Sequence, residues 1–98
     1  MRHSVKNSVL TIYLEGQITS TNAEDFSNAM AALVGKTRPT SVVLDATDLE
    51  FISSAGLRAI MRLVKAVQEV SVIGTSPDVY EVFDTTGFPQ VIDVRQAR

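Results

Sequence analysis

The 98-residue sequence lacks cysteine and tryptophan, and only 6% of its residues are aromatic. Without cysteine the chain can form neither a disulfide nor a thiolate metal site, and nothing points to an oxidising compartment. So few aromatic rings do not predict a surface on which nucleic acid bases stack. Metal-ligand spacings such as HExxH and glycine-rich phosphate loops are missing too. The sequence therefore predicts no metal and no cofactor.

An excess of one charge and a long hydrophobic run are also missing. The chain has 9 Lys and Arg against 11 Asp and Glu, a net charge of −2, which predicts no broad attraction to nucleic acid or to an anionic membrane. No apolar run approaches the ~20 residues of a membrane helix, and the first ten residues lack the apolar stretch of a secretory signal. We therefore expect a cytoplasmic protein with neither a nucleic acid nor a membrane as partner.

The pattern of apolar residues predicts one α/β domain over residues 1–98. A content of 45% apolar residues suits a single globular core. Amphipathic helices are predicted at 22–34, from Ser53-Ser54 to about 67 and from Ser76-Pro77 to about 86. Strands are predicted at 4–6, 9–15, 41–46, 70–73 and 91–94. This alternation is typical of a mostly parallel, mixed β-sheet of four to five strands with three helices.

Local signals suggest where these elements end. Thr21 and Glu24 have the spacing of a capping box at the start of the first helix, and Gly35 suits its C-terminal cap. Gly16 is expected to end the strand that precedes this helix. Residues 47–51 are expected to form a loop between the strand at 41–46 and the second helix.

The most informative stretch runs from Asp45 to Arg58, where a buried strand leads through polar residues to a helix that opens with two serines. In open α/β sheets, ligand sites gather at the carboxyl ends of the strands. A helix start offers free backbone N–H groups and a partial positive charge, both of which favour a phosphate. From the residues alone, Ser53 or Ser54 is simply an N-cap; a phosphorylated cap would use the same N–H groups.

The segment DLEFISSAGLRAI resembles the signature of STAS domains, and other segments resemble this family in the same order. These are VLTIYLEGQI, TSTNAEDF, SVVLDATDL and VIGTSPDVYEVFDTTGF, so the resemblance covers about residues 9–94. It implies a bacterial anti-sigma factor antagonist, a non-catalytic module of transcription regulation. Its partners would be an anti-sigma factor with serine kinase activity, which binds the unmodified domain, and a serine phosphatase that reverses the phosphorylation. A monomer or weak homodimer is expected.

The resemblance also implies site residues. Aligning Gly56-Leu57 with the family's Gly-Leu places the phosphorylated serine at Ser54, with Ser53 as second choice. The resemblance and the surrounding polar residues imply a partner-binding surface. This surface would comprise Ser20, Thr21, Asn22, Asp48, Ser53, Ala55, Gly56 and Arg58.

The chain departs from the family pattern in three places. Ser53 stands where many members have aspartate, which leaves two candidate hydroxyls. Thr19 stands where many have an aspartate soon after the first glycine. The helix that many members carry after the last strand is expected to be short or absent.

Three other functions remain open. The protein could be a constitutive STAS scaffold subunit of a signalling or transporter complex without phosphorylation. It could be a nucleotide sensor, although no adenine or ribose recognition element is visible. An enzyme is the least favoured, because the only histidine, His3, is far in sequence from the serines and no catalytic base is placed to activate them.

Overall fold

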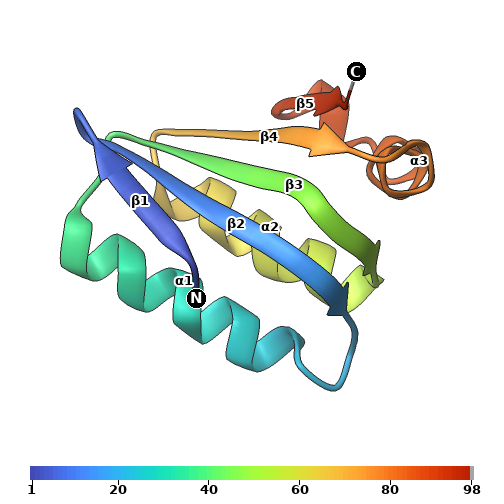
Figure 1. Ribbon diagram of the computed structural model, residues 1–98, viewed down its shortest axis with the longest axis horizontal. Coiled ribbons are helices and arrows are strands. Elements are labelled where there is room, and N and C mark those ends of the chain that lie inside the picture. Colours follow the sequence, from blue (N-terminus) through green and yellow to red (C-terminus); the bar gives the residue numbers. More distant parts are fainter. Residues whose placement is uncertain (98) are drawn as a thin grey trace.

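The computed structural model describes residues 1–97 as a twisted five-stranded sheet with helices packed on it (Figure 1). Its elements, in chain order, are β1 (His3–Lys6), β2 (Val9–Ile18), α1 (Ala23–Thr37), β3 (Ser41–Ile52), α2 (Ser54–Ala66), β4 (Glu69–Thr75), α3 (Pro77–Thr85), a 3-10 turn (Phe88–Gln90) and β5 (Asp93–Gln96). The described residues carry no α-helix after β5. The predicted fold class is confirmed.

The strands lie in the order β1-β2-β3-β4-β5. Only β1 is antiparallel to its neighbour; the pairs from β2 to β5 are parallel. The β1–β2 hairpin turns at Asn7 and Ser8, which both adopt positive φ values of 52° and 65°. Two such residues in a row define the type I′ geometry that matches the twist of a hairpin.

One face of the sheet is covered and the other is open. The covered face carries fully or nearly fully buried side chains at alternate positions of the three central strands: Leu10, Ile12, Leu14, Val42, Leu44, Ala46, Val70 and Val72. They share one core with the buried side chains of α1 and α2, which lie together beneath the sheet in Figure 1. The intervening residues, such as Thr11, Val43 and Ser71, are only half-buried. Helix α3 packs near the carboxyl ends of β3 and β4, and it also contacts β5.

The expected loop at 47–51 is wrong, because β3 continues through it to Ile52. Up to Ala46 every second residue of β3 is buried, but the next buried residues are Leu49 and Ile52, three apart. The register with β2 shifts twice over this stretch, once between Tyr13 and Glu15 and once after Gly16. Each shift inserts one extra residue on β3, which breaks the alternation of period two that marks a strand in a sequence.

Strand β2 also extends beyond its predicted end. It does not stop at Gly16 but runs to Ile18. Gly16 has a φ of 69° and stands at the second register shift, where its freedom to adopt positive φ lets the strand bend and continue. Likewise β4 runs past Gly74 to Thr75, and β5 spans 93–96 rather than 91–94.

The predicted capping box of the first helix does not form. Asn22 is the N-cap of α1 but caps no N–H of the helix; its side chain instead accepts from the N–H of Thr19 at 2.8 Å and donates to the carbonyl of Gln17 at 2.9 Å. At the other end the helix passes through Gly35 to Thr37, and Arg38 takes the left-handed conformation expected of a terminal glycine. By contrast Ser76, where the third helix is predicted to begin, caps α3 by accepting from the N–H of Val79 at 3.2 Å.

None of the helices in residues 1–97 combines the length and the apolar character that crossing a bilayer would require.

Replacing Phe83 with leucine should lower the free energy of unfolding by about 1–2 kcal/mol, because it opens a cavity in the core. Phe83 is fully buried and meets Phe88 edge to face at 5.3 Å between ring centroids. The matched control is Phe51→Leu, at a side chain that is 47% exposed, where a change within about 0.5 kcal/mol is expected. Urea denaturation measures both, and equal losses would contradict the assignment of the core.

Candidate functional site at the junction of β3 and α2

The ends of two parallel strands meet the start of α2 at one point. Ile18 and Ile52 are the last residues of β2 and β3 and lie opposite each other in the sheet. The next residue, Ser53, donates its backbone N–H to the carbonyl of Ile18 at 2.8 Å. The start of α2 is thereby fixed at the carboxyl edge of the sheet, where ligand and partner sites of α/β folds gather.

The two serines at this junction have different surroundings. Ser53 is the N-cap of α2: its hydroxyl oxygen accepts from the N–H of Gly56 at 3.3 Å, and its side chain is partly buried. Ser54 is the first residue of the helix and is exposed, and its hydroxyl makes no hydrogen bond within the described residues. The cap role therefore belongs to Ser53, and Ser54 presents a hydroxyl that the fold does not use.

Gly56 allows α2 to approach the strand ends closely. A Cβ at this position would lie 2.7 Å from Ile52 Cγ1 and 2.8 Å from Ile18 Cγ2, closer than real Cβ contacts allow. The glycine of the signature is thus required by packing. Because it is buried, it would act on a partner only by holding its neighbours in place.

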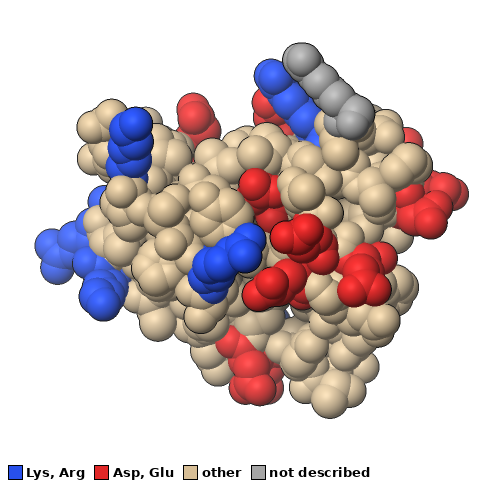
Figure 2. Space-filling view, in the orientation of Figure 1, with Lys and Arg blue, Asp and Glu red and all other residues tan. Residues whose placement is uncertain are grey.

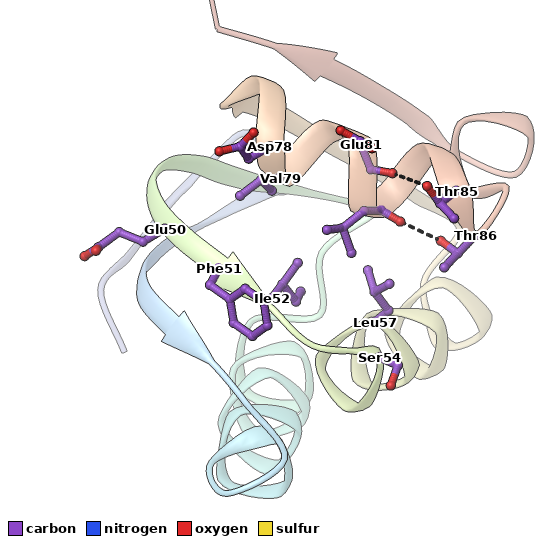
Figure 3. Close-up of a pocket in the computed structure, with 11 residues that line it drawn as sticks. Glu50, Phe51, Ile52, Ser54, Leu57, Asp78, Val79, Glu81, Thr85 and Thr86 are labelled. Atoms are coloured by element: carbon purple, nitrogen blue, oxygen red, sulfur yellow. Dashed lines mark hydrogen bonds between the residues drawn. The ribbon is translucent and has the colours of Figure 1, made fainter.

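Ser54 lines a groove of about 500 Å³ between α2, the end of β3 and α3 (Figure 3). Its walls are apolar at Phe51, Ile52, Leu57, Val79 and Val82, while Glu50, Asp78 and Glu81 lie at its rim with their carboxylates directed away from Ser54 (Figure 3). In the view of Figure 2, Asp and Glu gather over the centre and the right of the molecule, and most Lys and Arg lie at the left. The hydroxyls of Thr85 and Thr86 are already used, because they donate to carbonyls of the preceding helical turn.

On the other flank of α2 lies a second, more polar hollow of about 440 Å³. It is lined by Ser20, Ala23, Glu24, Asn28, Ala55, Arg58 and Arg62. Arg62 donates to the hydroxyl of Ser27 at 3.1 Å. Arg58 is exposed and forms no hydrogen bond or ion pair within residues 1–97.

The structure brings part of the predicted partner surface together. Ser20, Ala55 and Arg58 share the polar hollow, and Ala55 directly follows Ser54 in the chain. The exposed Thr21 lies in the same β2–α1 connection as Ser20. Asp48 is separate from both hollows, and its carboxylate lies 3.8 Å from Arg2.

Three other residues predicted for the partner surface are bonded or buried within the fold instead. Ser53 is engaged as a cap and Gly56 is buried, and the side chain of Asn22 folds back on the β2–α1 loop. Phe51, an exposed aromatic side chain at the groove, is not among the residues predicted for the partner surface. A loop, as predicted for residues 47–51, gives no side-chain direction, so the sequence alone does not place Phe51 at the groove.

Over residues 1–97, no cluster of three or more His, Asp or Glu side chains is arranged to hold a metal ion.

Comparison with known proteins defines the class to which this fold and site belong. The family model described as the STAS domain matches residues 2–98, and the chain belongs to this family. Among curated proteins it is similar to BtrV of Bordetella bronchiseptica, which is named as an anti-sigma factor antagonist. The two are 35% identical in an alignment 96 positions long, which covers 94% of this chain and 82% of BtrV.

Solved structures agree with this fold. An anti-sigma factor antagonist from Mycobacterium paratuberculosis superposes with a TM-score of 0.87 at 20% identity, over 96% of this chain and 82% of that one. Unphosphorylated SpoIIAA gives a TM-score of 0.81 at 16% identity, over 95% and 85% of the two chains. Phosphorylated SpoIIAA of Bacillus gives 0.65 at 17% identity, over 95% and 88%.

Alanine substitutions should separate the two serines. Ser53→Ala removes the cap of α2 and should lower the free energy of unfolding by about 1 kcal/mol. Ser54→Ala removes a hydroxyl without a partner and should change it by less than about 0.5 kcal/mol. Thermal or urea unfolding of both variants checks this, and a larger loss for Ser54→Ala would show that the roles are reversed.

A methyl group at Gly56 should destabilise the protein. Gly56→Ala places a Cβ against two isoleucines, and overpacking of this kind costs about 1–3 kcal/mol. Gly35→Ala is the matched control, since Gly35 lies inside α1 with nothing within 4 Å of its would-be Cβ. The control should be stabilised by roughly 0.5–1 kcal/mol. Unfolding midpoints that move in the same direction for both variants would contradict the close-approach role.

Proposed function

We propose that this protein is an anti-sigma factor antagonist whose binding to an anti-sigma factor is switched off by phosphorylation of Ser54. One observation carries the proposal: the hydroxyl of Ser54 is exposed and unbonded at the first residue of α2, while the adjacent Ser53 caps the helix. A kinase can modify such a hydroxyl without breaking any contact of the fold.

The homologues support the same role. BtrV is similar over most of both chains and is named as an anti-sigma factor antagonist. SpoIIAA, which shares the fold, occurs in an unphosphorylated and a phosphorylated form. The function proposed is non-catalytic: the anti-sigma factor supplies the kinase chemistry, and a separate serine phosphatase removes the phosphate by hydrolysis.

Phosphorylation would use ATP as co-reactant. The oxygen of Ser54 attacks the γ-phosphorus, an O–P bond forms, and the bond from that phosphorus to the bridging oxygen of ADP breaks. ADP leaves, and the hydroxyl proton passes to a base of the kinase. The exposed position of Ser54 supports access by a kinase active site.

The groove beside Ser54 supplies a physical reason for release. Phe51 is 47% exposed there, and aromatic side chains that become buried often dominate the affinity of an interface. A phosphate of about −1.5 to −2 charge on Ser54, at the edge of the same partner surface, would need to be desolvated on docking. A loss of ~3 kcal/mol weakens binding by roughly two orders of magnitude.

The partner surface proposed combines Phe51 with the exposed residues around α2. Ser20, Thr21, Ala55 and Arg58 would touch the anti-sigma factor. Ser53, Gly56 and Asn22 would contribute by holding the two connecting segments in position. Asp48 would contact only a partner large enough to reach the region of Arg2.

The test is to measure binding of the anti-sigma factor from the same organism, with the phosphate mapped by mass spectrometry after incubation with that kinase and ATP. Phosphorylation should appear on Ser54 and reduce affinity about 100-fold, as expected for ~3 kcal/mol. Ser54→Asp carries less charge and bulk than phosphoserine and should reduce affinity by about 10-fold.

Ser53→Asp is the matched control. It moves the same charge by one residue, and aspartate is itself a preferred N-cap, so affinity should stay close to that of the unmodified protein. A phosphate on another residue, or binding that does not respond to the phosphate on Ser54, would contradict the proposal. The second of these results is the one expected of a constitutive scaffold.

A further inference from the structure

Arg58 and Ser54 are exposed and separated by four residues on α2. Side chains at positions i and i+4 of a helix are neighbours, with Cβ atoms about 5–6 Å apart, and an anion that precedes a cation is the favourable order. Arg58 makes no ion pair or hydrogen bond within residues 1–97, whereas Arg62 donates to Ser27 and Arg2 lies near Asp48. Arg58 is therefore available to an anion on Ser54.

The charges around Ser54 differ between the two flanks of α2. On the groove side, Glu50 comes from β3 and Asp78 and Glu81 from α3. No Lys or Arg is among the residues that line this groove, so a phosphate on Ser54 would meet no cation there. On the opposite flank Arg58 and Arg62 share the polar hollow, so the local field would direct the phosphate toward that side.

Glu24 of α1 is the acidic residue of the polar hollow and the competitor for Arg58. It forms no ion pair with Arg58 within 4.0 Å. A phosphate carries more charge than a carboxylate and has three acceptor oxygens, which match the fork of a guanidinium. Arg58 should therefore bind the phosphate in preference to the carboxylate of Glu24.

We infer that Arg58 binds the phosphate of phosphorylated Ser54, and that the modification thereby withdraws Arg58 from the partner surface. The inference rests on the proposed phosphorylation of Ser54. In the unmodified protein the guanidinium is free to pair with an acidic group of the anti-sigma factor. In the modified protein the guanidinium turns back by one helical turn to the phosphate. One modification thus adds a negative charge to the partner surface and withdraws a positive charge from it.

The test measures the second pKa of the phosphate, which is about 6 when unperturbed. Phosphoserine is introduced at position 54 during translation, and the phosphorus NMR signal is followed against pH without any partner present. An arginine paired with the phosphate favours the dianion and therefore lowers the second pKa of the phosphate. The midpoint with Arg58 in place should be lower than with Arg58→Gln by roughly half a pH unit.

Arg62→Gln is the matched control, because it removes the same charge two helical turns from Ser54. Its midpoint should stay close to that of the otherwise unaltered phosphoprotein. Equal midpoints with and without Arg58, or equal shifts for both substitutions, would overturn the inference. Since neither kinase nor anti-sigma factor is used, these results are independent of whether the cell phosphorylates Ser54, which the binding experiment above decides.

Discussion

The close contact of α2 with the ends of two strands determines the geometry of the whole site. Gly56 permits it, because any side chain there would collide with Ile18 and Ile52. Two hydrogen bonds fix the first turn of the helix: the Ser53 N–H donates to the carbonyl of Ile18, and the Ser53 hydroxyl oxygen accepts from the N–H of Gly56. With its neighbours held so firmly, Ser54 can remain free. A rigid support with one uncommitted hydroxyl suits the proposed switch, in which a surface changes its chemistry and keeps its shape.

Much of the fold was predictable because it follows local rules. Alternating or continuous apolar runs identified β2, β3 and β4, and the amphipathic stripe of α2 and the Ser76-Pro77 start of α3 identified helices. The misplaced boundaries have a different origin. Glycine commonly ends a strand or a helix, yet β2 continues through Gly16 because it pairs with β3, and α1 continues through Gly35 because of its packing. Such tertiary effects leave no signal in a short window of sequence.

The site was predictable only in part, and for a similar reason. The motif predicts Ser54 and Arg58 as candidate site residues, but which serine caps α2 follows only from the hydrogen bond that Gly56 donates to Ser53. The groove could not be predicted, because it forms between segments distant in sequence, with Phe51 on β3 and Val79 on α3. Nor could the separation of acidic and basic groups across α2 be predicted, since it arises from how α3 and α1 flank that helix.

The two register shifts of β3 have a consequence for how this family can vary. After both shifts the alternation is restored, so that Ile52 lies in the core and Phe51 in the groove. Removing or adding a single residue between Asp45 and Ser53 would exchange these two side chains between inside and outside. Evolution can therefore alter the composition of this stretch freely at its exposed positions, while its length is constrained. Insertions and deletions among close relatives should avoid it and collect in the β1–β2 turn and the segment between α3 and β5.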